Sequence, residues 1–324
     1  MSVTDLSTTY KPFNYPEYVE FTVEHEAMTW GEWELSLQRD VNQWKDGTID
    51  PIEKDHITQL LRLFTQSDKV VGQSHVDVFL PYFKANEARM AILSIANRES
   101  THVRAYALLN DTLGFPESEF TAFLEYVEMV DKVEFMEDFL PSGTADAASA
   151  MGINLARTVL NEGLSLFSAF IQLLNYQRPE AGSKMQGMCE AVEWSVRDET
   201  KHVEFWAMLF RKHLEENPHV VTDQFKAAIY SMYRMGVALE DVLIDLSYRM
   251  GGPKSLPKED LKQYIRFIAD RRLVQLGLKE NYGIAINPLE WVDHIIGGDT
   301  QKNFFEGRVT DYNTNGLVGL WGWE

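Results

Sequence analysis

Two stretches of the sequence decide the fold: residues 99–106, which read ESTHVRAY, and residues 198–202, which read DETKH. Each contains a Glu-x-x-His pair, whose two side chains lie one turn apart on the same face of a helix and can share a metal ion. Each pair falls in the middle of a long helical pattern with an apolar stripe. A carboxylate inside a helical bundle is costly unless it is paired or binds metal, so these motifs predict a metal site in the core.

The same spacing occurs twice more, in contexts that argue against metal binding. Glu53 and His56 lie in the polar first turn of a helix, where acidic residues favour the helix dipole in any case. Glu216 and His219 flank Pro218 at a helix end, so we expect this pair to face solvent. Only the pairs Glu99/His102 and Glu199/His202 therefore count as candidate ligands.

Two further acidic residues complete the candidate site. Glu162 interrupts the apolar run of residues 155–170, and Asp68 closes the helix that precedes Glu99. Four helices then offer one carboxylate each, two of them with a histidine, which is the ligand set of a dinuclear carboxylate centre in a helical bundle. Oxygen and imidazole donors without thiolate suit iron or manganese better than soft metals.

The alternative to a metal site is a set of buried salt bridges, and the sequence is short of the cations that these need. Lys69, Arg98, Arg197 and Lys201 lie within two residues of a candidate ligand. On a helix, neighbours at that spacing point to other faces. The dinuclear metal site is therefore the preferred interpretation.

The rest of the chain divides into three parts. We expect an irregular N-terminal arm packed on the bundle (residues 1–50), one all-α domain of long helices (residues 51–300) and a flexible C-terminal tail (residues 301–324). Asp50 is a good N-cap and Pro51 suits a first helical turn. Beyond the helix that starts there, the periodicity predicts helices over about residues 85–113, 117–140, 144–178, 183–216, 221–250 and 257–280.

Composition excludes several classes of protein. Acidic residues outnumber basic ones by 49 to 30, and the net charge of −19 argues against nucleic acid and anionic lipid as partners. The sequence shows no signal-peptide pattern and no apolar span of membrane length, so we expect a soluble, cytoplasmic protein. Cys189 is the single cysteine, which excludes a disulfide framework or dithiol redox chemistry within one chain.

The order Asp68, Glu99–His102, Glu162, Asp198–Glu199–His202 resembles the small, radical-generating subunit of class I ribonucleotide reductase. A tyrosine one turn beyond the first histidine, Tyr106, strengthens the likeness, which runs from about residue 30 to residue 312. The resemblance implies a ferritin-like bundle with two iron ions, two manganese ions or one of each in its core. It also implies that Tyr106 is oxidised to a stable radical.

The same resemblance assigns relay roles. Trp30 matches the family's interior tryptophan in the electron–proton path, with Trp33 as the competing candidate three residues away. Asp198 matches the aspartate that accepts a hydrogen bond from the ligand His102 and orients it. In the tail, Tyr312 matches the mobile tyrosine that hands the oxidising equivalent on, with Glu306 as its acidic companion.

A partner subunit follows from the chemistry. Reduction of a ribose hydroxyl needs a thiyl radical and a reducing dithiol, which a chain with one cysteine lacks. The resemblance therefore implies a ribonucleoside-diphosphate reductase in which this chain, as a homodimer, sends the oxidising equivalent to a large catalytic subunit by long-range proton-coupled electron transfer. We expect the residues after about Asn315 to dock on that subunit through Trp321 and Trp323.

Three positions depart from the family pattern: Lys69 after Asp68, Leu166 one turn beyond Glu162, and Ser195 one turn before Glu199. They leave open which metals bind, which oxidant activates them, and whether the radical rests on Tyr106 or the metals hold the oxidising equivalent. A dimetal oxidase or monooxygenase acting on a small substrate is the alternative enzyme. Iron storage is a further alternative, although it predicts a chain of about half this length.

Overall fold

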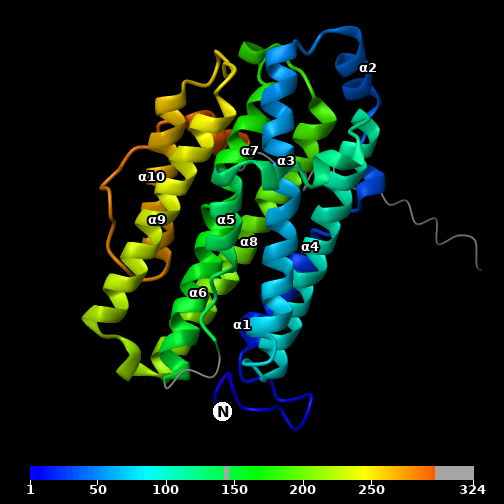
Figure 1. Ribbon diagram of the computed structural model, residues 1–324. Helices are drawn as coiled ribbons and strands as arrows, with labels where there is room; N and C mark the ends of the chain where they lie inside the picture. Colours follow the sequence, from blue (N-terminus) through cyan, green and yellow to red (C-terminus); the bar gives the residue numbers. More distant parts are fainter. Residues whose placement is uncertain (142–145, 296–324) are drawn as a thin grey trace, which may run out of the picture. The chain divides into compact units, whose positions relative to one another are not determined.

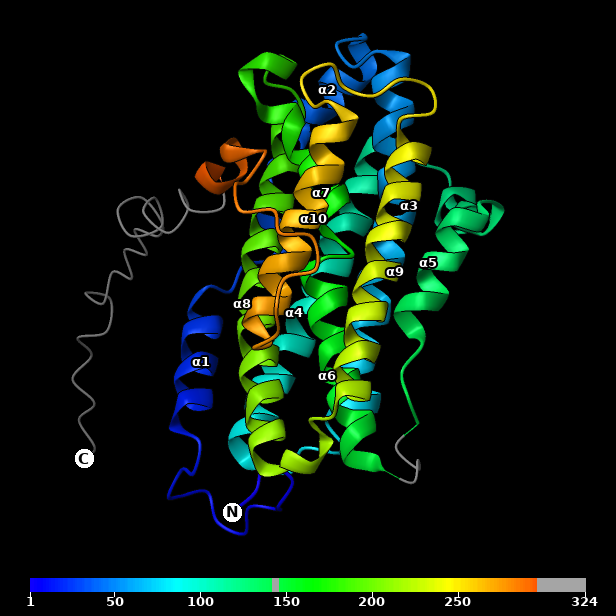
Figure 2. The same cartoon turned by 90° about the vertical axis from the view of Figure 1, so that its left-hand side faces the viewer.

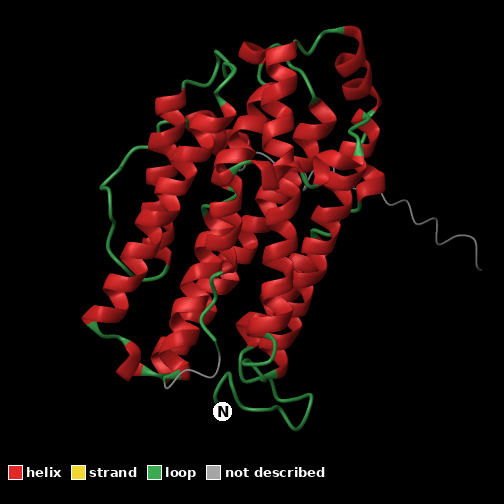
Figure 3. Cartoon of the chain, in the orientation of Figure 1, coloured by secondary structure: helices red, strands yellow, loops and turns green. Residues whose placement is uncertain are grey.

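The computed structural model describes residues 1–141 and 146–295, apart from the side chains of residues 64 and 65. Within these ranges the regular secondary structure is entirely helical (Figure 3), which confirms the all-α prediction. The α-helices are α1 (Pro16–Ala27), α2 (Gln38–Asp46), α3 (Pro51–Ser74), α4 (Asn86–Leu113), α5 (Val127–Glu137), α6 (Ala147–Gly163), α7 (Phe167–Leu174), α8 (Gln186–Glu216), α9 (Asp223–Ser247) and α10 (Lys258–Gln275).

Short 3-10 and π-helical turns lie in the connections between these helices: η1 (Glu32–Glu34), η2 (His75–Phe79), η3 (Glu117–Phe120), η4 (Ala122–Glu125), η5 (Asn175–Gln177), η6 (Pro179–Ala181) and η7 (Pro218–Val220). Residues Met1–Leu289 form one compact unit. Of the second unit, Glu290–Glu324, residues 290–295 are described, and they are helical. No helix among the described residues is both long and apolar enough to cross a membrane.

Four long helices, α3, α4, α6 and α8, run side by side through the compact unit (Figures 1 and 2), with α6 packed against α8 and α3 against α4. Helices α9 and α10 pack against each other and both contact α6, while α1 lies against α4 and α8. The buried stripe of α4 shows how the core is built. Its members recur at three- and four-residue spacing and include candidate ligands among apolar residues: Ala88, Ile92, Ile95, Glu99, His102, Tyr106, Leu109 and Leu113.

The start of α3 follows the sequence prediction. The Asp50 carboxylate accepts hydrogen bonds from the backbone N–H groups of Ile52 (2.8 Å) and Glu53 (2.9 Å), and the Glu53 carboxylate accepts one from the N–H of Asp50 (3.0 Å). This reciprocal capping box satisfies donors that the first helical turn leaves unpaired. The predicted helices over about 85–113 and 183–216 are confirmed as α4 and α8.

The first 50 residues are more ordered than the prediction of an irregular arm, because they contain α1 and α2. The buried face of α1 consists of Tyr18, Phe21, Thr22 and His25. This spacing is helical, but two of its four members are polar. Hydrophobic periodicity therefore gives little signal for this helix.

The predicted helix over about 144–178 is interrupted, because α6 ends at Gly163 and α7 begins at Phe167. Two buried cations hold carbonyl groups at the break: Arg272 Nε donates to Gly163 O (2.9 Å), and Lys132 Nζ donates to Ser165 O. A Cβ atom at position 163 would lie 2.6 Å from Arg272 Nε, so only glycine permits this approach. The break is therefore set by residues from α5 and α10, which the local pattern cannot show.

Two other local expectations are wrong. Asp68 does not close a helix, because α3 continues to Ser74 and passes into the π-helical turn η2. Glu216 is half-buried rather than solvent-facing, since it accepts hydrogen bonds from the backbone N–H of Val3 (3.1 Å) and from Tyr15 Oη (2.9 Å). Glu216 thus anchors the N-terminal segment on α8, whereas His219 is exposed.

The motif Glu53/His56 places its histidine in the core, away from the candidate ligands. His56 is fully buried, with Nδ1 2.9 Å from Tyr176 Oη and Nε2 2.9 Å from Gln172 Oε1. Burial lowers the pKa of His56 to about 4, so the imidazole is neutral at pH 7. The motif here serves packing and hydrogen bonding.

This burial predicts a pH dependence of stability. The unfolded chain takes up a proton on His56 near pH 6.5, whereas the folded protein does so near pH 4, so stability present above pH 6.5 is lost as the pH falls through about 4. The difference corresponds to about 3 kcal/mol. Denaturant unfolding of the wild type and a His56→Gln variant at pH 7 and pH 4 should show a steeper loss in the wild type. Equal losses would contradict the assignment.

Candidate metal centre

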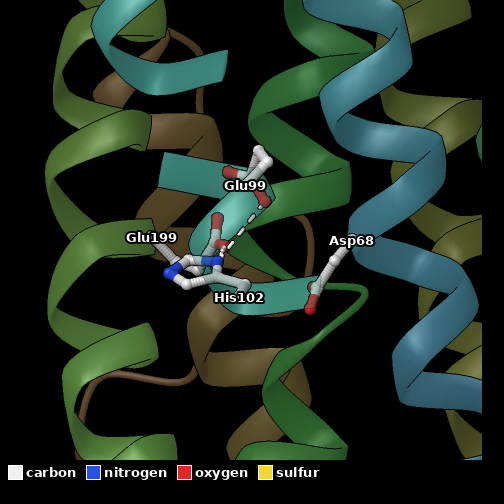
Figure 4. Close-up of side chains that lie close together, drawn as sticks. All are labelled: Asp68, Glu99, His102 and Glu199. Atoms are coloured by element: carbon white, nitrogen blue, oxygen red, sulfur yellow. Dashed lines mark ion pairs between the residues drawn. The ribbon is translucent and has the colours of Figure 1, made fainter. Parts of the chain in front are cut away.

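The six predicted ligands come together at the centre of the bundle. Asp68 lies on α3, Glu99 and His102 on α4, Glu162 on α6, and Glu199 and His202 on α8. Figure 4 shows the side chains of four of them pointing toward one another from α3, α4 and α8. Each of the six residues is at most 1% exposed.

The ligand atoms form two overlapping groups. Within each group, one ligand atom from every residue lies within 4.8 Å of all the others, a spacing that a single metal ion can bridge. The first group is Asp68, Glu99, His102 and Glu199, and the second is Glu99, Glu162, Glu199 and His202. Glu99 and Glu199 belong to both groups, so their carboxylates could serve both of two bound ions, whereas each of the other four residues belongs to one group.

A glycine brings two of these helices close together. A Cβ atom at Gly72, one turn beyond Asp68 on α3, would lie 3.0 Å from the Cβ atom of Glu99 on α4. That distance is tighter than ordinary van der Waals contact. The small residue therefore lets α3 approach α4 where their carboxylates must share one site.

The inward-facing atoms have no hydrogen-bond partner, although the imidazole rings lie within ion-pair distance of the carboxylates. Both oxygens of Asp68, Glu99 and Glu199 have no hydrogen-bond partner, nor do Glu162 Oε2 and the Nδ1 atoms of His102 and His202. A buried polar atom left unpaired costs about 1–3 kcal/mol, and more when it is charged. This set of unpaired oxygen and nitrogen donors fits divalent iron or manganese, which would satisfy all of the atoms at once.

The two imidazole rings are oriented for metal binding. His102 Nδ1 lies 3.3 Å from Glu199 Oε1, and His202 Nδ1 lies 3.0 Å from Glu99 Oε1. Their Nε2 atoms point outward, to Asp198 Oδ2 (3.2 Å) and to Nε2 of His25 (3.0 Å). An outward hydrogen bond that holds the proton on Nε2 leaves the lone pair of Nδ1 free for a metal ion.

Without a bound metal ion, the negative charges of the cluster must be balanced by protons. Burial raises the pKa of Glu162 to about 8, against the opposing attraction of His202, and burial also raises the pKa of Asp68 well above its usual value. Burial lowers the pKa of His102, but the charge of Glu99 and the neighbouring carboxylates outweigh it and raise that pKa well above its usual value. Protons thus neutralise the cluster when metal does not, so metal ions must displace protons on binding.

Asp198 forms the outer contact of His102. Its Oδ2 atom accepts hydrogen bonds from Trp30 Nε1 (2.7 Å) and from Arg98 Nη1 (2.8 Å) as well as contacting His102. The Trp30 ring also stacks against the His102 ring, with centroids 5.9 Å apart. Trp30 is buried whereas Trp33 is 74% exposed, so the structure places Trp30 and not Trp33 beside the cluster.

As expected, the ion pairs of Arg98 and Arg197 with described residues do not involve a candidate ligand, but both arginines reach the neighbouring Asp198. Arg98 is buried, and its long side chain reaches from α4 to Asp198 on α8; Arg197 lies 3.5 Å from Asp198 Oδ1. Both cations pair with Asp198 and neither pairs with a candidate ligand in the described contacts. Lys201 instead pairs with surface Glu204 (3.0 Å), and Lys69 is exposed.

Tyr106 is fully buried one turn beyond His102. Its hydroxyl donates to Ser195 Oγ (2.9 Å), which in turn donates to the carbonyl of Ala191 (3.0 Å). Burial, followed by the nearby charge of Asp68, raises the pKa of the Tyr106 phenol well above its usual value. Of the three unusual positions in the sequence, Ser195 is thus the one that hydrogen-bonds a candidate site residue; Leu166 is simply buried.

Sequence reasoning missed two histidines. His25 on α1 contacts His202, and His75 in η2 has Nε2 3.4 Å from Glu162 Oε1 while its ring stacks on Trp206, with centroids 4.9 Å apart. Both lie outside any Glu-x-x-His motif. The helical spacing of Tyr18, Phe21 and His25 could have pointed to His25. The sequence offered no comparable signal for His75.

The remaining predicted residues, Glu306, Tyr312, Trp321 and Trp323, lie outside the described part of the chain. Their roles stay predictions.

The helical bundle and its buried cluster define a class: a helical protein whose four central helices carry residues that could hold two metal ions. Comparison with known proteins narrows this class. The family model "Ribonucleotide reductase, small chain" matches residues 7–288. The chain belongs to this family of oxidoreductase subunits.

Named relatives agree with the family. The chain is 34% identical over 331 residues to a probable ribonucleoside-diphosphate reductase small subunit of Invertebrate iridescent virus 3, covering 98% of this chain and 87% of that protein. It is 30% identical over 316 residues to the ribonucleoside-diphosphate reductase subunit beta of Chlamydia pneumoniae, covering 94% and 90% of the two chains.

Solved structures confirm the ferritin-like type of bundle. The ribonucleotide reductase R2 subunit from Clostridium botulinum superposes with a TM-score of 0.79 at 20% identity, covering 91% of this chain and 94% of that one. Dimanganese(II)-NrdF of Streptococcus sanguinis superposes with a TM-score of 0.71 at 18% identity, covering 90% and 98%. At these identities the likeness concerns the fold alone.

The geometry predicts the metal stoichiometry. Wild-type protein should bind two divalent ions per chain, and Glu162→Ala should lose one of them while the helical fold persists, because Glu162 belongs to one ligand group only. Elemental analysis after equilibrium dialysis, with circular dichroism, measures both. Glu240→Gln is a matched control, since Glu240 is an equally buried glutamate that pairs with Lys132 outside the cluster. Two ions retained in Glu162→Ala would contradict the ligand assignment.

Proposed function

We propose that this small chain of ribonucleotide reductase assembles a dinuclear metal centre, generates an oxidising radical equivalent there, and passes it to a large catalytic subunit. The observation that carries the proposal is the cluster of buried carboxylate and imidazole atoms that have no hydrogen-bond partner. Asp68, Glu99, His102, Glu162, Glu199 and His202 would hold the two ions. Bound iron or manganese would supply the one-electron chemistry that these side chains lack.

Trp30 and Asp198 provide a hydrogen-bonded route away from His102. Burial alone would raise the pKa of Asp198, but the hydrogen bond from His102 and the charge of Arg98 bring it below its usual value, so Asp198 is ionised. The Trp30 N–H group donates to this carboxylate at 2.7 Å. When Trp30 loses an electron, its N–H proton can therefore move to the Asp198 carboxylate, which lies within hydrogen-bond distance.

Tyr106 is the proposed resting place of the radical. Its hydroxyl is buried, lies one turn from a candidate ligand and donates a hydrogen bond to Ser195. Burial keeps solvent and reductants away from the phenol, and the Ser195 hydroxyl fixes the orientation of the O–H group. The serine thus contributes an interaction that an aliphatic residue at this position would not.

Removing the Tyr106 hydroxyl tests this role. In Tyr106→Phe, the organic radical signal should vanish from the electron paramagnetic resonance spectrum of the metal-reconstituted protein, while metal content stays at two ions per chain. Ser195→Ala should keep a radical and change its spectrum, since the hydrogen bond is lost. Tyr233→Phe, at another fully buried tyrosine, is the control and should leave the signal unchanged. A radical that persists in Tyr106→Phe would place it elsewhere.

The large subunit is needed because Cys189 cannot serve as a redox cysteine. Its thiol is fully buried, bonds to the carbonyl of Leu173 (3.3 Å), and burial raises its pKa well above the usual value. Thiyl and dithiol chemistry must therefore come from a partner. We propose that residues 316–324, whose Trp321 and Trp323 are large apolar anchors, bind this partner, and that Tyr312 relays the oxidising equivalent to it.

Truncation after Asn315 tests the proposed docking segment. Metal content and the radical signal should stay at wild-type levels, whereas association with the large subunit and ribonucleotide reduction should be lost. A synthetic peptide of residues 316–324 should inhibit the full-length complex. Unchanged affinity and turnover in the truncated chain would overturn the docking role.

The family match favours this function over a small-substrate oxidase and over iron storage. The oxygen and nitrogen donors suit iron and manganese alike. The homodimer and the cytoplasmic location stay predictions.

A further inference from the structure

The two candidate histidine ligands have different partners on their outer sides. His102 Nε2 faces the carboxylate of Asp198 at 3.2 Å, which in turn is held by Arg98 and Trp30. His202 Nε2 faces Nε2 of another imidazole, His25, at 3.0 Å. The outer partner of one ligand is therefore an anion, while that of the other is a neutral ring.

The hydrogen-bond chain beyond His202 has one consistent arrangement of protons. If His202 Nδ1 binds a metal ion, its proton must lie on Nε2, which then donates to His25 Nε2. His25 consequently carries its own proton on Nδ1, which lies 2.8 Å from Ser94 Oγ and donates to it. The chain runs from α8 through α1 to α4, and each of its members has a defined role as donor or acceptor.

The position of the His25 ring is fixed by packing along α1. The ring stacks on Phe21, with centroids 5.6 Å apart, and Phe21 stacks on Phe205 of α8 at 5.0 Å. Tyr18 meets the same Phe205 edge-on at 5.4 Å. These contacts seat α1 against α8 one turn beyond His202, so the acceptor atom of His25 is held in place before any metal binds.

We propose that His25, supported by Ser94, is a positioning residue for the ligand His202, so that a side chain of the N-terminal helix α1 supports the metal position beside His202. This inference rests on the proposed function. A carboxylate partner makes an imidazole ligand more basic than a neutral partner does. The metal position beside His202 is therefore the weaker of the two, and its affinity depends on α1.

Titration of the metal-free full-length chain with Co²⁺, followed by visible absorption and isothermal calorimetry, tests this inference. The wild type should bind two ions in unequal steps. His25→Leu removes the outer hydrogen-bond partner of His202. It should lower the affinity of the weaker Co²⁺ step at least tenfold and shift the absorption bands of that ion, while the tighter step stays unchanged. His25→Gln should restore much of the affinity, because its amide oxygen can accept from His202 Nε2.

Two further variants keep the test decisive. Ser94→Ala removes only the far end of the chain from a half-buried position and should weaken the same step to a smaller extent. If His25→Leu fails to fold, the titration of Ser94→Ala decides between the two outcomes. His56→Leu removes a buried histidine outside the cluster and should change neither step.

The outcomes separate this inference from the proposed function. A wild type that binds fewer than two ions contradicts the dinuclear centre itself. Two ions in the wild type, with both steps and both sets of bands unchanged in His25→Leu and Ser94→Ala, overturn only the role of His25. Equal weakening of both steps in folded His25→Leu also overturns it, because a selective contact cannot act on both positions alike.

Discussion

Four buried carboxylates that pair with no lysine or arginine among the described residues are the constraint on which this structure depends. Asp68, Glu99, Glu162 and Glu199 converge from four helices at a point that solvent does not reach. Such a core is unstable unless protons or metal ions neutralise it. The raised pKa values of Asp68 and Glu162 correspond to neutralisation by protons. Two divalent ions would neutralise the core in place of protons.

The surroundings of the cluster keep it from collapsing into ordinary salt bridges. The buried Arg98 is bound to Asp198, and the cations Lys132 and Arg272 bind carbonyl groups at the break between α6 and α7. Each of these positive groups therefore has a partner outside the ligand set. The inward-facing ligand atoms therefore stay available for metal ions. The carbonyl groups of Gly163 and Ser165, just after Glu162, are held by Arg272 and Lys132.

Much of this organisation could be predicted from the sequence. The pairs Glu99/His102 and Glu199/His202 lie in mid-helix with apolar neighbours, so spacing and periodicity sufficed to identify them and the helices that carry them. Glu162 stood out because it interrupts an apolar run. Asp68 could be selected as an acidic residue on the helix that precedes Glu99. The family resemblance then related Asp198 and Trp30 to the same site, and the structure brings all three residues together with the other candidate ligands.

What the sequence could not show depends on contacts between distant helices. His25 belongs to a helix whose buried face is half polar, and its partner His202 is 177 residues away. Arg98 reaches Asp198 only because α4 and α8 are adjacent, and the break after Gly163 depends on Arg272 and Lys132. Local spacing describes one helix at a time and contains no information on these pairings.

An anomalous difference map from crystals grown with Mn²⁺ would test the central claim most directly. The account predicts two peaks per chain, one beside Asp68 and His102 and the other beside Glu162 and His202, with Glu99 and Glu199 between them. A map without metal peaks at the cluster, or with a single peak at full metal saturation, would contradict the dinuclear centre.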